Sequence, residues 1–134
     1  MFNLVKIENG RMNVPEPEYF NAVSGTEIQV GQALILDGGV LKVLSAGTTK
    51  PEFISLGHVS ASAAKREIPV ARVNDEQVYE VPVSAAPTAL KVGDKVTLTT
   101  DGLEVTATTA SGVATIVNLK GAAAAGDKLL VKFV

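Results

Sequence analysis

The sequence contains no cysteine and no tryptophan, and it has only one histidine, two tyrosines and four phenylalanines. Without cysteine the chain cannot form disulfides or thiolate metal sites, which fits synthesis in a reducing cytoplasm. No apolar run approaches the roughly 20 residues that span a bilayer, and no positively charged region precedes an apolar stretch at the N-terminus. We therefore expect a soluble, unprocessed chain with no membrane partner.

The chain also lacks any basic cluster. Its formal net charge is -2, and lysines alternate along the sequence with acidic residues. Proteins that bind nucleic acid neutralise phosphates with clustered Lys and Arg, so we expect no nucleic-acid partner. The 134 residues suffice for one compact domain, or for two very small lobes that share a core.

Motifs for catalysis, cofactors or metals are also missing. His58 lies in an apolar stretch without a second histidine, a cysteine or a Gly-x-Ser-x-Gly elbow, and nothing places it beside a serine and an aspartate. Asp37, Asp94, Asp101 and Asp127 each neighbour a glycine, as turn residues do, and no window has calcium-loop spacing. No phosphate-binding loop is present. We predict no catalytic, cofactor-binding or metal-binding residues and expect that the protein is not an enzyme.

Residues 1–25 differ from the rest of the chain. Pro15 and Pro17 oppose both helix and central strand, because each lacks an N–H and holds its predecessor extended. We predict an extended N-terminal arm that carries half of the aromatic residues and contacts a partner's surface or sheet edge. The alternative is that the arm packs back on its own chain. The predicted partner-binding residues are Phe2, Leu4, Val5, Ile7, Val14, Pro15, Pro17, Tyr19 and Phe20.

From residue 26 onward, short apolar stretches alternate with turn residues, which predicts strands and almost no helix. Asn74-Asp75 and Asp101-Gly102 each predict a hairpin turn. Alternation places Tyr79, Val81 and Val83 on one face of their strand. The predicted strands are Ala33 to Leu36, Val40 to Leu44, Phe53 to Val59, Ile68 to Val73, Gln77 to Val83, Val96 to Thr100, Leu103 to Thr108, Val113 to Asn118 and Lys128 to Val134.

An internal repeat predicts two β units, residues 26–83 and 84–134. Residues 28–36 align with 90–98, and the match continues without a gap from 41–43 to 103–105. Residues 61–70 align with 122–131 after a one-residue slip. The alternative is chance similarity between β segments with Val-Gly turns. Gly31 and Gly93 are predicted to occupy equivalent turns where a side chain would clash.

The predicted fold class is all-β: a compact β-barrel-like or β-sandwich-like protein with an internal duplication of a small β-motif and an extended N-terminal arm. Whether the two units form one barrel or two lobes stays open at this point.

Five segments have a characteristic pattern of strands and turns: residues 39–51, 79–83, 90–98, 101–103 and 125–133. Through these segments, residues 26 to 134 resemble head-decoration proteins of bacteriophages, also called capsid cement or auxiliary capsid stabilisation proteins.

The resemblance implies a structural virion protein on the capsid exterior, made in the host cytoplasm. Such a protein binds the major capsid protein, bridges its subunits and stabilises the head. Related decoration proteins are often trimers, so self-association as a trimer or another oligomer is an expectation. The alternatives are another virion β module, such as a tail or head-fibre component, and a carbohydrate-binding domain.

Overall fold

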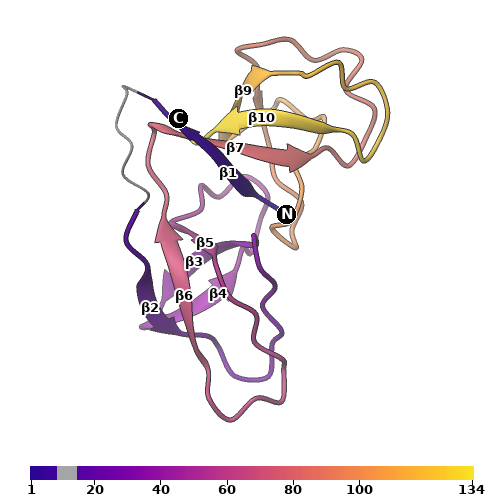
Figure 1. The fold of residues 1–134 in the computed structure, drawn as a ribbon. Coiled ribbons are helices and arrows are strands. Elements are labelled where there is room, and N and C mark those ends of the chain that lie inside the picture. Colours follow the sequence, from indigo (N-terminus) through magenta and orange to yellow (C-terminus); the bar gives the residue numbers. More distant parts are fainter. Residues whose placement is uncertain (9–14) are drawn as a thin grey trace.

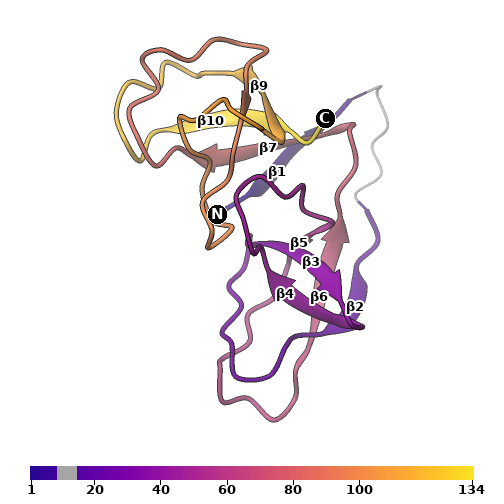
Figure 2. The same cartoon turned by 180° about the vertical axis from the view of Figure 1, so that it is seen from behind.

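The computed structural model of the chain describes residues 1–8 and 15–134 and confirms the all-β class (Figure 1). It contains two antiparallel five-stranded sheets, and the described residues form no helix. The sheets are not closed into a barrel. In both views one sheet lies at one end of the molecule and the other sheet lies at the opposite end (Figures 1 and 2).

Sheet 1 has the strand order β2-β6-β5-β3-β4, and sheet 2 has the order β1-β7-β10-β9-β8. The strands of sheet 1 are β2 (Glu18–Asn21), β6 (Glu67–Arg72), β5 (Phe53–Ser55), β3 (Ala33–Asp37) and β4 (Val40–Val43). The strands of sheet 2 are β1 (Asn3–Ile7), β7 (Gln77–Pro82), β10 (Lys128–Lys132), β9 (Ala114–Asn118) and β8 (Lys95–Val96).

Three predicted strands are much shorter in the structure. The predicted strand from Val96 to Thr100 is reduced to β8 (Lys95–Val96), beyond which Leu98 forms an isolated bridge with Val105. β5 ends at Ser55, and beyond it Val59 forms only an isolated bridge with Ile28. The predicted strand from Leu103 to Thr108 is reduced to isolated bridges made by Val105. Val59 and Val105 are buried at these isolated contacts and not along a continuous ladder, whereas Leu56 stays exposed.

The prediction of a hairpin at Asn74-Asp75 is wrong, because β6 and β7 belong to different sheets. Gln77 explains the change of direction. Its fully buried side-chain carbonyl accepts hydrogen bonds from the Asn74 N–H (3.2 Å) and the Tyr79 hydroxyl (2.7 Å), and its amide donates to the Arg72 carbonyl (3.0 Å). This buried amide fixes the crossover between the sheets.

β7 lies in sheet 2 with β8, β9 and β10, so it belongs with the second unit and not, as the predicted bounds 26–83 and 84–134 have it, with the first. Below, the first unit means residues 15–73 and the second unit means residues 77–134.

The two sheets have the same strand pairing after a shift along the sequence. Tyr19 of β2 lies opposite Pro69 of β6, and 61 residues later (19 to 80 and 69 to 130) Glu80 of β7 lies opposite Leu130 of β10. Further equivalent pairs are Ser55↔Val70 with Ile116↔Val131, and Ala33↔Ile54 with Lys95↔Thr115. β1 is the additional strand of sheet 2 and lies beyond β7.

One stretch of the predicted alignment is wrong. The Leu41 carbonyl accepts the Val23 N–H at 2.9 Å, and the equivalent acceptor in the second unit is Val105, which binds the Ser84 N–H at 2.8 Å. Leu41 therefore corresponds to Val105 and not to Leu103. The hairpin around Gly102, whose φ is +70°, is two residues longer than its counterpart.

Gly31 and Gly93 occupy equivalent turns with φ of +74° and +94°. A Cβ on Gly31 would lie 2.3 Å from Cγ of Met1 and 2.9 Å from the Phe2 carbonyl, so the predicted clash is confirmed there. The clash predicted for Gly93 is wrong, because no atom lies within 4 Å of that Cβ position. At Gly93 only the left-handed backbone favours glycine.

The two units share buried side chains and backbone hydrogen bonds. Ala33 and Ile54 from the first unit are buried in the same cluster as Val96 and Phe133 from the second. The Gly102 carbonyl accepts the Ala33 N–H at 2.8 Å. Two further hydrogen bonds join the units. The Leu98 N–H donates to the Gly47 carbonyl (2.9 Å), and the Gln32 side-chain amide donates to the Asp101 carbonyl (2.6 Å). The units are therefore joined directly and not only through the chain.

Candidate interaction surface

The N-terminal arm is built into both sheets. β1 pairs with β7 along the edge of sheet 2, and β2 pairs with β6 along the edge of sheet 1. The N-terminal segment thus supplies one outer strand to each sheet (Figure 1). The described residues of the arm therefore pack on their own chain, which is the alternative given above to contact with a partner.

The predicted partner-binding residues differ widely in exposure. Phe2 is 3 % exposed, whereas Val5 is 46 % and Tyr19 61 % exposed. Pro17 is exposed as well, and Val14 lies outside the described residues. The remaining four are partly buried: Leu4, Ile7, Pro15 and Phe20. The exposed members are therefore the ones available to a partner.

Phe2 belongs to an aromatic cluster in the core. Its ring lies 5.3 Å from the Phe133 ring and 6.2 Å from the Tyr79 ring, the latter edge-on, and Tyr79 and Phe133 are 5.6 Å apart. Edge-to-face and tilted rings at these separations attract each other beyond their hydrophobic burial. Burial raises the pKa of Tyr79, whose hydroxyl is neutral and donates to Gln77. The cluster anchors the start of the chain.

An apolar cavity of about 280 Å³ opens where the N-terminal segment lies between the two units. Its lining comes from distant parts of the sequence and is mostly apolar. The lining residues are Met1, Phe2, Asn3, Leu4, Pro15, Val30, Gly31, Ile54, Ser55, Leu56, Ala71 and Tyr79.

Three of the apolar lining residues are also exposed: Met1 (53 %), Val30 (44 %) and Leu56 (45 %). We call them the apolar rim. Val30 precedes Gly31 in the tight turn that packs on Met1. Leu56 follows β5, where the Ser55 hydroxyl donates to the Gly57 carbonyl at 2.5 Å and turns the chain. Exposed apolar side chains around an apolar cavity are typical of an interaction site.

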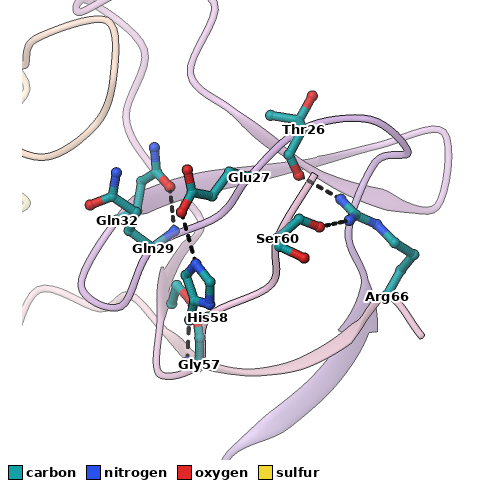
Figure 3. A network of polar contacts seen from close by, with 9 residues as sticks. Thr26, Glu27, Gln29, Gln32, Gly57, His58, Ser60 and Arg66 are labelled. Carbon is teal, nitrogen blue, oxygen red and sulfur yellow. Dashed lines mark hydrogen bonds and ion pairs between the residues drawn. The ribbon is translucent and has the colours of Figure 1, made fainter. Parts of the chain in front are cut away.

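A separate cluster of polar contacts ties two loops together near His58 (Figure 3). The His58 ring lies 2.8 Å from the Glu27 carboxylate, and about half of each side chain is exposed. In the described part of the chain His58 is hydrogen-bonded to no serine hydroxyl, and the neighbouring Ser55 hydroxyl is bonded to the backbone. The pair joins the segments on either side of the Ile28–Val59 bridge.

Arg66 holds the same loops from the opposite side. Its guanidinium donates to the carbonyls of Val23 (2.6 Å) and Thr26 (2.5 Å) and also to that of Ser60. Its Nε is buried and has no partner among the described residues. Three carbonyl acceptors make this arginine a connector of backbone segments.

Residues 1–8 and 15–134 contain no cluster of three or more His, Cys, Asp or Glu side chains that could hold a metal ion. In the same residues, no helix is long and apolar enough to cross a membrane.

Comparison with protein-family models and with curated proteins finds no match for this chain. The class of the protein is therefore described by its fold and surface alone. It is an all-β protein of two five-stranded sheets, with the apolar rim around a cavity where the two units meet.

Sequence reasoning missed the apolar rim. The sequence pattern places Val30 in a turn and Leu56 in a strand, and it does not single out Met1. One signal is available in the sequence: Val30 directly precedes Gly31, a glycine that favours a tight turn. An apolar residue in such a turn is seldom buried.

Proposed function

We propose that this protein is a structural binding protein of a bacteriophage head, which attaches to the outer surface of the capsid and stabilises it by bridging major capsid subunits. The observation that carries the proposal is the apolar rim of Met1, Val30 and Leu56 around an apolar cavity. A side chain of a capsid subunit that enters the cavity would bury these residues together with itself. Full burial of a Val or Leu side chain is worth about 1.5–3 kcal/mol.

The resemblance of residues 26 to 134 to head-decoration proteins supports the same role. We further propose that the two units arose by duplication of one β-motif, which the equivalent strand registers support. Many copies on a symmetric shell would make weak single contacts effective together. Self-association, as a trimer or another oligomer, belongs to this proposal.

The test uses heads assembled without this protein from the major capsid protein encoded in the same phage or prophage genome. Purified full-length chain is mixed with the heads, and bound protein is measured after sedimentation. Val30→Asp and Leu56→Asp are expected to weaken binding at least about tenfold, because each places a charge at the contact.

Val92→Asp is the matched control. Val92 occupies the turn position of the second unit that is equivalent to Val30, and it is 62 % exposed, but it does not line the cavity. We expect it to bind like the unmodified chain. If the unmodified chain does not bind heads, the proposed function is wrong; if it binds and all three variants bind equally, the rim is not the contact.

A further inference from the structure

A second depression of the surface lies at the start of β6, whereas the apolar cavity lies near its end. The depression is open to solvent, has a volume of about 560 Å³, and is lined by residues from the end of β2, from β4 and from the connection that precedes β6. We call it the β6 hollow. Glu67 lines the hollow and Ala71 lines the cavity, so the two sites are about 13 Å apart along the strand.

The β6 hollow carries an excess of positive charge. Lys65 and Arg66 both line it, and the acid in its lining is Glu67. In the described part of the chain neither cation forms an ion pair. Arg66 donates to three backbone carbonyls, which carry no net charge, and its buried Nε has no partner among the described residues.

The acids closest to Arg66 along the chain or across the sheet are bonded elsewhere. Arg66 binds the Thr26 carbonyl, but the carboxylate of the next residue, Glu27, is directed at His58 and lies 2.8 Å from its ring (Figure 3). The Glu18 carboxylate of β2 accepts two hydrogen bonds from Arg72, each 2.9 Å long. A partly buried cation is stabilised by a counter-ion, and these acids do not supply one.

The second unit shows that the fold does not require a cation at this place. The Ala22 N–H donates to the Arg66 carbonyl at 2.8 Å, and the equivalent bond joins the Val83 N–H to the Asp127 carbonyl at 3.0 Å. Asp127 therefore occupies the position of Arg66, and its carboxylate accepts two N–H groups of its own loop. The positive charge is thus a feature of the first unit alone.

The lining of the β6 hollow indicates which anion fits. Besides the two cations, the exposed side chains of Asn21 and Ser24 offer an amide and a hydroxyl as hydrogen-bond donors. A carboxylate is bound by donors of these kinds. Glu67 would repel a doubly charged phosphate more strongly than a singly charged carboxylate, and the net charge of -2 opposes a long polyanion.

We propose that the β6 hollow binds the carboxylate of an aspartate or glutamate side chain of the major capsid protein, and this inference rests on the proposed capsid-binding function. Lys65 and Arg66 attract the carboxylate, and the Ser24 hydroxyl donates to it. The apolar rim and the β6 hollow are then two separate contacts on the first unit. Two contacts allow one chain to hold two segments of the capsid at once, as bridging requires.

Ser24→Asp and Ser24→Asn form a matched pair for the head-binding assay described above. The aspartate places a carboxylate of the chain itself in the hollow, where it competes with the carboxylate of the capsid. We expect Ser24→Asp to bind heads at least about tenfold more weakly than the unmodified chain. Asparagine has nearly the same shape without the charge, so Ser24→Asn should bind like the unmodified chain.

Lys65→Glu tests the charge directly and leaves the three backbone bonds of Arg66 intact. Its control is Lys50→Glu, because Lys50 is also exposed but lines neither the hollow nor the cavity. At about 0.1 M salt we expect Lys65→Glu to bind at least about tenfold more weakly than its control. At about 1 M salt the difference should fall below about threefold, because the screening length shortens from about 10 Å to about 3 Å. Circular dichroism checks that each variant is folded.

The outcomes separate the two proposals. If the unmodified chain binds heads and both charged variants bind like their controls, the carboxylate site is wrong and the capsid role stands. A loss in Lys65→Glu that is equally large at high salt also overturns the site, because charge would not be its cause. If the unmodified chain does not bind heads at all, both proposals are wrong.

Discussion

Replacement of Phe2 by alanine tests whether the first residues of the chain are part of the core. Phe2 is 3 % exposed and contacts the rings of Tyr79 and Phe133. Truncation of a buried Phe to Ala costs about 3–5 kcal/mol, whereas a chain of this size has a total stability of about 7–20 kcal/mol. We expect Phe2→Ala to fold with its free energy of unfolding lowered by about 4 kcal/mol.

Urea unfolding followed by circular dichroism measures this loss. With a typical slope of about 2 kcal/mol per molar urea, the midpoint should fall by about 2 M. Val5→Ala is the control on the same strand. Val5 is 46 % exposed, so its truncation should change stability by less than about 0.5 kcal/mol. A Phe2→Ala variant as stable as Val5→Ala would show that β1 is detached in solution and would refute the argument.

Three further predictions concern turns, a buried amide and an exposed carboxylate. In the same urea assay, Gly93→Ala should cost about 1 kcal/mol for its backbone conformation alone, and Gly31→Ala clearly more, because its Cβ also meets Met1 and Phe2; equal losses would contradict the packing on Gly31. Gln77→Leu should cost about 2–4 kcal/mol by leaving buried groups unbonded, and a loss under 1 kcal/mol would show that they find other partners. The Ala123 and Ala124 N–H groups lower the pKa of Asp127, so its contribution to stability is present above about pH 4 and is lost as the pH falls through the folded-state pKa. Asp127→Asn should flatten this acid dependence in urea unfolding at pH 2 to 6, and an unchanged profile would contradict the assignment.

Strand positions after residue 26 follow well from the sequence, because alternation of apolar residues directly reflects a half-buried strand. β3, β6 and β7 lie within one or two residues of their predicted bounds. β1 and β2 were not predicted as strands, since the prolines between them mask the signal and their partners β7 and β6 are far away in the sequence.

Pairing was harder to predict than position. A turn signal such as Asn74-Asp75 says that the chain reverses or bends, but not which sheet the next strand joins. Here the buried amide of Gln77 decides this, and nothing in its neighbours along the sequence marks it as buried. The cavity was beyond reach for the same reason, because its lining combines segments around residues 1, 30, 55 and 79.

The reciprocal contacts between the units have a mechanical consequence. A hairpin of the second unit supplies the Gly102 carbonyl to Ala33, and a loop of the first unit supplies the Gly47 carbonyl to Leu98. Neither unit can open without breaking bonds that hold the other, so heat or a pulling force should unfold the chain in a single cooperative step. In the proposed role on a capsid that expands under internal pressure, this coupling would transmit force between the two sheets without separating the units.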